Sequence, residues 1–304
     1  MSNRLYPGRT ESVDVVVVSY NSRDRIRACV EPLLAIPSVH VIVVDNASPD
    51  RSLEAVDGLQ LTAVQLPNNG GFAHGVNEGW RKGSSPYVLL LNPDARIDGP
   101  AIDTLVAALD EAPELGAVAP RIVNDDGVLE YSQRRFPRLR STYARAFFLH
   151  RVFPKAPWTD EVIRDQEAYA RHGNPDWVSG ACILVRRGVL AELDGLDEGF
   201  FMYSEDIDLC RRLQLAGYGL LFEPAAVVAH AGGASEPRTN LLPILAGSRL
   251  RYASKHRGRA VAFLERVGVA LEALTHIAVA RGGSAARAGH ARALRLAITR
   301  PDQS

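Results

Sequence analysis

A chain of 304 residues is long enough for one large domain, or for a catalytic domain with an appended segment. With 46% hydrophobic and 23% charged residues and a formal net charge of zero, the composition is that of an ordinary globular protein, and no overall field favours nucleic acid as a partner. The three cysteines, Cys29, Cys182 and Cys210, lack metal-ligand spacing, and their odd number favours a reduced, cytosolic compartment in which all three are buried.

Strand and helix patterns alternate through the first hundred residues. Four apolar runs have the character of strands buried on both faces of a sheet, and two segments between them have apolar residues at helical spacing. The expected strands are Val13–Val18, Val39–Val44, Leu61–Leu66 and Tyr87–Leu91, and the expected helices are Ser22–Ala35 and Phe72–Lys82. This alternation predicts an α/β fold with a mostly parallel sheet, in which ligands bind at the carboxyl ends of the strands.

The rest of the chain is less regular and ends in helices. The expected strands are Gly116–Pro120, Gly127–Glu130, Cys182–Arg186, Tyr218–Phe222 and Ala226–Ala229, and the expected helices are Ser204–Ala216, Leu241–Lys255, Arg259–Ala280 and Ser284–Thr299. Charged residues interrupt the apolar stretch from Ala260 to Ala280, so we interpret it as amphipathic rather than membrane-spanning.

Polar or turn-forming residues follow each of the first four strands. Asp45 directly follows a buried strand, so its carboxylate could accept a hydrogen bond from the imide or ribose of a nucleotide, or could simply open a turn. Gly70 and Gly71 allow a backbone to approach a ligand closely, and they suit a tight turn equally well. Asp94, which ends the sequence Asn-Pro-Asp, could bind a divalent cation or serve only as a turn residue.

Three carboxylates, those of Glu205, Asp206 and Asp208, come just after an aromatic run that begins at Phe200. A carboxylate cluster beside apolar surface can hold a proton acceptor whose pKa is set by its neighbours. Ser204 could instead be the N-cap of a helix whose first turn suits acidic residues. The two interpretations are compatible, because a helix can begin at Ser204 while Asp206 faces a ligand.

Two regions are basic and interleaved with apolar residues. Between Tyr131 and Trp158 there are seven lysines or arginines and no acid, and between Arg238 and Ser304 there are twelve, against three acids. This combination suits contact with an anionic membrane surface, and it suits an ordinary solvated basic face nearly as well.

Seven short motifs, in this order, resemble those of the family 2 glycosyltransferases, and the rhamnosyltransferase-like branch in particular. They are Val-Val-Ser-Tyr-Asn (17–21), Val-Asp-Asn-Ala-Ser (44–48), Asn-Asn-Gly-Gly-Phe (68–72), Leu-Asn-Pro-Asp-Ala (91–95), Ser-Gly-Ala-Cys (179–182), Phe-Phe-Met-Tyr-Ser-Glu-Asp-Ile-Asp-Leu (200–209) and His-Ala-Gly-Gly-Ala-Ser (230–235). The resemblance implies a GT-A fold over residues 1–237. Its nucleotide-sugar half would cover about 13–125 and its acceptor half 126–237, followed by a basic helical extension over 238–304.

The resemblance also implies roles by position. Asn92-Pro93-Asp94 stands in the place of the family's Asp-x-Asp motif, so Asp94 would hold Mg²⁺ or Mn²⁺ on the donor diphosphate, with His230 as a second metal contact or as a structural residue. Asn92 replaces the first acid of that motif, which leaves dependence on the metal open. Asp206 matches the general base, and Glu205 would support it. The implied donor-binding residues are Ser19, Tyr20, Asn21, Asp45, Asn46, Asn69, Gly70, Gly71, Phe72, Asn77, Asn92 and Asp94, and the implied acceptor-binding residues are Trp177, Gly180, Glu205 and Asp206.

The implied reaction is a single displacement with inversion at the anomeric carbon. The donor would be dTDP-L-rhamnose, with a UDP-hexose as the nearest alternative. The acceptor would be a saccharide, or a saccharide linked to polyprenyl diphosphate, in cell-wall or surface polysaccharide synthesis. The alternative hypotheses are a nucleotidyltransferase and a non-catalytic nucleotide-sugar-binding module. We expect a cytoplasmic protein with no nucleic-acid partner, and leave open a peripheral position on the anionic inner face of the plasma membrane.

Overall fold

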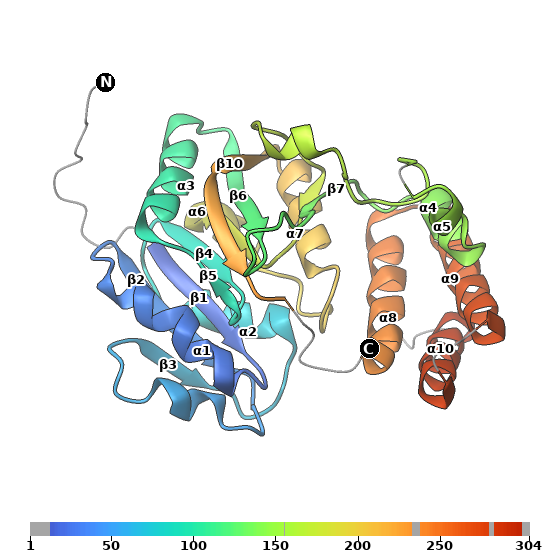
Figure 1. Ribbon diagram of the computed structural model, residues 1–304, viewed down its shortest axis with the longest axis horizontal. Helices are drawn as coiled ribbons and strands as arrows, with labels where there is room; N and C mark the ends of the chain where they lie inside the picture. The colour runs from blue at the N-terminus through green and yellow to red at the C-terminus, as the bar shows by residue number, and fades with distance from the viewer. Residues whose placement is uncertain (1–12, 155, 233–237, 280–282, 300–304) are drawn as a thin grey trace.

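The computed structural model describes residues 13–154, 156–232, 238–279 and 283–299. Its centre is an eight-stranded sheet in the order β3-β2-β1-β4-β9-β6-β10-β5 (Figure 1). The strands are β1 (Val13–Ser19), β2 (Val39–Asp45), β3 (Thr62–Gln65), β4 (Tyr87–Leu91), β5 (Ala95–Arg96), β6 (Leu115–Val123), β9 (Cys182–Arg186) and β10 (Gly219–His230). Four of the seven neighbouring pairs are parallel; β9 runs antiparallel between β4 and β6, and β5 antiparallel to β10. The predicted mostly parallel α/β sheet is therefore confirmed, as part of a mixed sheet.

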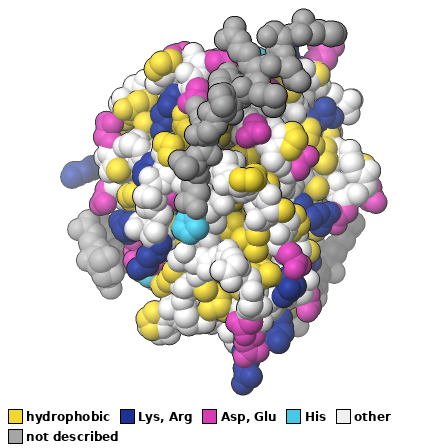
Figure 2. All heavy atoms as spheres, turned by 90° about the vertical axis from the view of Figure 1, so that its left-hand side faces the viewer, with side chains coloured by type: hydrophobic (Ala, Val, Ile, Leu, Met, Phe, Trp, Pro, Cys, Tyr) yellow, Lys and Arg dark blue, Asp and Glu magenta, His cyan; other side chains and the backbone are white. Residues whose placement is uncertain are grey.

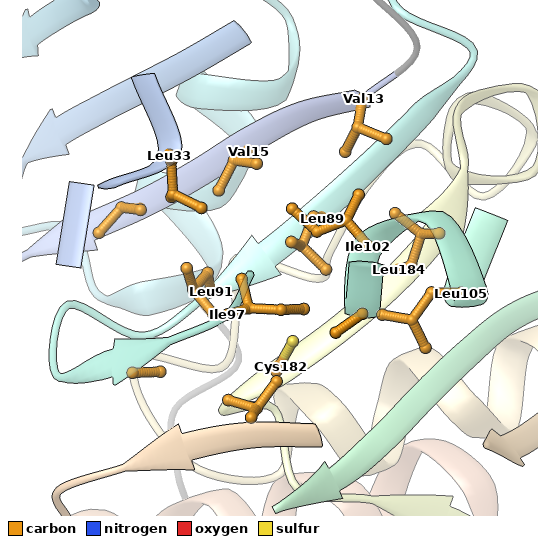
Figure 3. Packing of buried hydrophobic residues seen from close by; sticks show 14 of the residues in the cluster. Val13, Val15, Leu33, Leu89, Leu91, Ile97, Ile102, Leu105, Cys182 and Leu184 are labelled. Carbon is orange, nitrogen blue, oxygen red and sulfur yellow. The ribbon is translucent and has the colours of Figure 1, made fainter. Parts of the chain in front are cut away.

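Helices cover both faces of the sheet, as the continuous apolar strands require. The helices around it are α1 (Arg23–Val30), η1 (Glu31–Ala35), η2 (Ser52–Val56), α2 (Phe72–Trp80), α3 (Gly99–Glu111), α6 (Arg187–Glu192) and α7 (Glu205–Leu215). Val13 and Val15 point to the core that α1, η1 and α3 cover, where Leu33 and Ile102 lie (Figure 3). Val16 belongs to the opposite core, which α2, α6 and α7 cover.

Three expectations differ from the structure. The helix predicted for 22–35 is split into α1 and the 3-10 turn η1, which contains Pro32 and so lacks one backbone donor. The strand predicted at Gly127–Glu130 is a turn with one isolated bridge, because the Asn124 side chain accepts the backbone N–H groups of Asp126 and Val128. The strands predicted at 218–222 and 226–229 form one strand, β10, whose register shifts between Glu223 and Val227.

A second group of helices packs at one end of the sheet (Figure 1). It consists of α4 (Leu139–Ala146), α5 (Leu149–Val152), α8 (Arg238–His256), α9 (Arg259–Val279) and α10 (Gly283–Ile298), and we call it the helical lobe. The buried carboxylate of Glu265 on α9 accepts from Thr142 of α4 at 2.7 Å and from Arg249 of α8 at 3.0 Å. Within the described ranges, no helix combines the length and apolar character that crossing a bilayer requires.

A short two-stranded ribbon and a 3-10 turn connect the sheet to this lobe. The ribbon pairs β7 (Gln133–Arg134) with β8 (Trp177–Val178), and the 3-10 turn η3 is Gln166–Tyr169. The three cysteines are buried and form no disulfide, as the sequence predicts. On the face of the molecule seen in Figure 2, acidic and basic side chains are interspersed, in keeping with a net charge of zero.

Candidate active site

A cavity of about 770 Å³ opens where the carboxyl ends of β1, β2 and β4 meet. Twelve of the residues that the sequence singled out line it: Tyr20, Asn21, Asn46, Asn69, Gly71, Phe72, Asn92, Asp94, Gly180, Glu205, Asp206 and His230. Its volume lies in the range of small-ligand sites, about 300–1,000 Å³. The topology explains the assembly, because parallel strands deliver the residues that follow them to one edge of the sheet.

Two buried oxygens near this edge have no hydrogen-bond partner in the described residues. The pairing of β1 with β2 sets Ser19 beside Asp45. Asp45 uses Oδ2 to accept from the Ser48 backbone and from Gln65 Nε2, at 2.9 and 2.7 Å. Asp45 Oδ1 and Ser19 Oγ are the unpaired atoms. Both residues lie beneath the cavity rather than on its lining, so their donor-binding roles remain predictions.

The glycine loop after β3 is held in place by Asn46 and by Phe201. Asn46 Oδ1 accepts from the Gly70 backbone at 3.0 Å, and its Nδ2 donates to the Gly71 carbonyl at 2.9 Å. Gly71 has φ 89°, and a Cβ there would lie 2.1 Å from the Phe201 carbonyl oxygen, so only glycine fits. The Phe72 backbone donates to the same oxygen at 2.8 Å, which joins this loop to the segment before α7.

Two predicted contact residues turn away from the cavity. Asn77 is buried on α2, where its Nδ2 donates to the Leu196 carbonyl and to Glu198, both at 2.8 Å. Trp177 is buried on β8, and its indole donates to the Arg135 carbonyl at 2.9 Å. Gly70 also stays off the cavity lining. In the present conformation these residues support loops around the site, and direct ligand contacts for them remain predictions.

The carboxylate pair lies at the start of α7, which begins at Glu205. Tyr203 and Ser204 both have φ 68°, a conformation that non-glycine residues adopt rarely, so the backbone turns sharply into the helix. Ser204 occupies the predicted N-cap position, but its hydroxyl makes no capping hydrogen bond. Asp206 instead accepts from the Ile207 backbone through Oδ1 at 2.8 Å and from the Gly180 backbone through Oδ2 at 3.2 Å.

Burial makes both carboxyls better proton acceptors than ordinary ones. Burial raises the pKa of Glu205 well above its usual value, and the charge of Asp206 adds to this effect. Burial also raises the pKa of Asp206, against the opposing hydrogen bonds from Ile207 and Gly180 and the charge of Arg134. Glu205 is 8% exposed, and its Oε2 has no hydrogen-bond partner in the described residues. A buried Glu205 and a half-buried Asp206, both with raised pKa and both facing the cavity, suit the role of a general base.

Across the cavity, the pairing of β5 with β10 brings Asp94 next to His230, because Ala95 pairs with His230. Asp94 Oδ1 lies 3.3 Å from His230 Nε2, and the other ring nitrogen, Nδ1, lies 3.1 Å from Glu130 Oε2. Burial works to raise the pKa of Asp94, but the hydrogen bond and charge of His230, together with Arg25, lower it overall.

These residues fit a divalent ion that the substrate helps to bind. A carboxylate and an imidazole nitrogen converge on one point, and Glu130 orients the imidazole as carboxylates commonly do behind metal-bound histidines. Among the described residues, no three His, Cys, Asp or Glu side chains cluster to hold an ion by themselves. Phosphate oxygens of a ligand and water would therefore have to complete the coordination.

Sequence reasoning missed several residues of the site. Glu130 and Arg25 contact the Asp94–His230 pair from distant parts of the chain, and no local pattern marks them. Asn240, Leu241 and Ile244, from the first turns of α8, line the cavity opposite the sheet. An apolar stripe on α8 could have suggested packing, but not that it packs at the site.

Comparison with known proteins identifies the family. Residues 14–193 match the family model described as Glycosyl transferase family 2. The chain belongs to this family. It is 30% identical over 267 residues to N-acetylglucosaminyl-diphospho-decaprenol L-rhamnosyltransferase of Mycobacterium tuberculosis, covering 82% of this chain and 86% of that protein. It is 29% identical to Rhamnosyltransferase WbbL of Escherichia coli, covering 72% and 83%. The chain is thus a family 2 glycosyltransferase of the rhamnosyltransferase-like kind, as its motifs predict.

Solved structures agree on the fold. A mannosyltransferase from Pyrobaculum calidifontis, in complex with GDP-Man and Mn²⁺, superposes with a TM-score of 0.56 at 21% identity, covering 97% of this chain and 83% of that one. Glucosyl-3-phosphoglycerate synthase of Mycobacterium tuberculosis gives a TM-score of 0.55 at 16% identity, covering 82% and 80%. This family 2 glycosyltransferase therefore has the predicted GT-A fold, with C-terminal helices. Its family and its relatives make it a hexosyltransferase that acts on a nucleotide-sugar donor.

Proposed function

We propose that this glycosyltransferase moves L-rhamnose from dTDP-L-rhamnose to a saccharide linked to polyprenyl diphosphate, with inversion at the anomeric carbon. The observation that carries the proposal is the half-buried Asp206 carboxylate, which faces the same cavity as Asp94 and has a raised pKa. The names of the two relatives support rhamnose as the sugar, and the name of the mycobacterial one supports the acceptor class. A UDP-hexose is the second candidate donor.

Asp206 would act as the general base. As the acceptor hydroxyl oxygen bonds to the anomeric carbon, its proton moves to an Asp206 oxygen, and the bond between that carbon and the diphosphate breaks. The hydrogen bonds from Ile207 and Gly180 fix the carboxylate without satisfying all its lone pairs. A single base and no covalent intermediate give inversion. Glu205 would support Asp206 from the same turn of α7, and the charge of Asp206 would help to keep Glu205 protonated.

Asp94 and His230 would hold a divalent cation on the donor diphosphate. When bound, such an ion stabilises the negative charge of the departing nucleoside diphosphate. An imidazole ligand suits Mn²⁺ better than Mg²⁺, because Mg²⁺ prefers oxygen ligands throughout. Glu130 would keep Nε2 of His230 directed at the ion by accepting from Nδ1.

The helical lobe would bring the enzyme to the membrane that carries a polyprenyl acceptor. Phe147, Phe153 and Phe263 expose 55%, 50% and 63% of their surface on this lobe. The exposed Arg140 lies in the first turn of the helix that Phe147 follows, and the exposed Arg151 lies two positions before Phe153. Apolar side chains flanked by arginines suit an anionic bilayer. Lys155, which the sequence placed in the same basic segment, lies outside the described residues. This arrangement supports a cytoplasmic enzyme bound peripherally, with residues 238–304 acting as an extension of the catalytic domain.

The test is Asp206→Asn, compared with Asp125→Asn on the exposed hairpin after β6. With dTDP-L-rhamnose and an N-acetylglucosaminyl-diphospho-polyprenol acceptor, turnover should fall by about 10²–10⁴-fold for Asp206→Asn alone. Binding of dTDP, measured by calorimetry, should survive. Nuclear magnetic resonance of the wild-type product should show inversion. Unchanged turnover in Asp206→Asn would exclude this base, and a wild type that binds nucleotide sugar without transfer would favour the non-catalytic binding module.

A further inference from the structure

Arg25 reaches into the cavity from the first turn of α1. Its Nη1 lies 3.2 Å from Asp94 Oδ2 and donates to the Gly232 carbonyl at 3.1 Å. These partners lie 69 and 207 positions away in the sequence, so the guanidinium joins α1 to the residues that follow β4 and β10. Its side chain is 51% exposed, and the exposed part lines the cavity.

A purely structural ion pair accounts poorly for this placement. Asp94 already has His230 as a close partner on its other oxygen. An ion pair with one half-exposed member contributes only about 0–1 kcal/mol to stability. Arg27, two residues further along the same helix, shows what a structural pair looks like here: it contacts Glu31 and the Ala55 carbonyl, outside the cavity lining.

The charges around Asp94 indicate a role for Arg25 in binding an anionic ligand. Asn92 stands where the family motif has an acid, so the described wall around Asp94 carries one carboxylate fewer for a cation to bind. Arg25 supplies a fixed positive charge at the same point. A guanidinium offers several N–H donors in a planar fork that matches two phosphate oxygens, which a lysine ammonium cannot reproduce.

We propose that Arg25 is a binding residue for the donor's diphosphate, which it engages by exchanging its Asp94 contact for phosphate oxygens. This inference rests on the proposed function. It deepens that function by giving the site a cation of its own, so that nucleoside diphosphate binds even when no divalent metal is present. Asp94 Oδ2, released from Arg25, is then free for the metal when it is available.

The experiment is calorimetric titration of dTDP and UDP into wild type, Arg25→Gln, Arg25→Lys and Arg27→Gln, each in EDTA and in Mn²⁺. In EDTA we expect Arg25→Gln to weaken binding about tenfold or more, as the loss of hydrogen bonds to a charged group predicts. Arg25→Lys should be intermediate, and Arg27→Gln should bind within about twofold of wild type. Mn²⁺ should reduce the defect of Arg25→Gln, because the ion neutralises the same phosphates.

The outcomes separate the two proposals. Equal affinities of Arg25→Gln and Arg27→Gln in EDTA would overturn the role of Arg25 and leave the proposed function standing. So would a wild type that binds nucleotide in Mn²⁺ and not in EDTA. A wild type that binds neither nucleotide in either buffer would overturn both proposals. Thermal melting of each variant, which should match wild type for these exposed side chains, checks that the comparisons concern folded protein.

Discussion

Replacing Asp208 by asparagine should lower stability and turnover together. Asp208 is fully buried on α7, two residues after the proposed base Asp206. Its Oδ1 lies 2.6 Å from His256 Nε2 and 2.7 Å from Lys255 Nζ, both on α8, and its Oδ2 lies 2.7 Å from Arg212 Nε. One carboxylate thus ties the catalytic helix to the helical lobe.

The size of the effect follows from the burial of each partner. Removing one partner of a buried ion pair costs about 3–5 kcal/mol. Asparagine keeps one acceptor oxygen, Lys255 is 32% exposed and can turn to water, and Arg212 retains the carbonyls of Leu193 and Gly195. We therefore expect a loss of about 2–3 kcal/mol, which at roughly 2–4 °C per kcal/mol lowers the melting temperature by about 4–12 °C.

The assay pairs urea denaturation with steady-state kinetics, and Asp197→Asn is the matched control. Asp197 also forms an ion pair with Lys255, and it forms a second one with Arg251, whose side chain is 45% exposed. Losing the charge of Asp197 should therefore cost no more than about 1 kcal/mol of stability. For Asp208→Asn, turnover relative to wild type should fall by more than the fraction of folded protein does, because α7 no longer holds Asp206 in place. If Asp208→Asn proves no more destabilising than Asp197→Asn, the argument that α8 anchors the catalytic helix fails.

Two further predictions concern the carboxyl pair and the helical lobe. The pKa of Glu205 is higher in the folded than in the unfolded protein. Protonated Glu205 therefore contributes its full stability below the unfolded pKa of about 4.3, and this contribution is lost as the pH rises through the folded pKa. Glu205→Gln should therefore raise the free energy of unfolding, measured in urea, at pH 8 and change it little at pH 4. A larger increase at pH 4 than at pH 8 would contradict this. The double change Phe147→Ser with Phe153→Ser should reduce sedimentation with anionic liposomes, whereas Val128→Ser, on the hairpin after β6, should not. Equal sedimentation of all three proteins would remove the membrane contact.

The central sheet could be predicted because its strands carry their own signal. The β-branched runs of β1 and β2 are apolar on both faces, which only a covered, largely parallel strand can satisfy. Helix α3 was missed although its start is well marked: the Asp98 side chain accepts from the Ala101 backbone at 2.9 Å, and Pro100 opens the first turn. These two residues are a local signal for a helix start, and they are sufficient to predict this helix.

The site could be predicted where its residues follow strands or, as with Glu205 and Asp206, where they stand in a motif that resembles the family's. Tyr20, Asn46 and Asp94 reach the cavity because β1, β2 and β4 end at the same edge. Arg25 reaches the cavity, and Glu130 reaches His230, through contacts between distant segments, for which the sequence has no periodic pattern. The direction of the pKa shift of Asp206 cannot be predicted from the sequence for the same reason, since it depends on burial and on Ile207, Gly180 and Arg134 from separate elements.

The basic segments show why charge along a sequence does not locate a charged surface. Arg134 stacks over the Trp177 ring, with its guanidinium carbon 5.3 Å from the ring centroid, and Arg249 is enclosed by Glu265 and Glu272. Both cations are engaged in internal contacts, Arg134 within the two-stranded ribbon and Arg249 within the helical lobe. The exposed arginines of α4 and α5 are Arg140 and Arg151, and we propose that these two contact an anionic partner. The membrane proposal therefore concerns one end of the lobe, beside Phe147 and Phe153, and not the whole basic region.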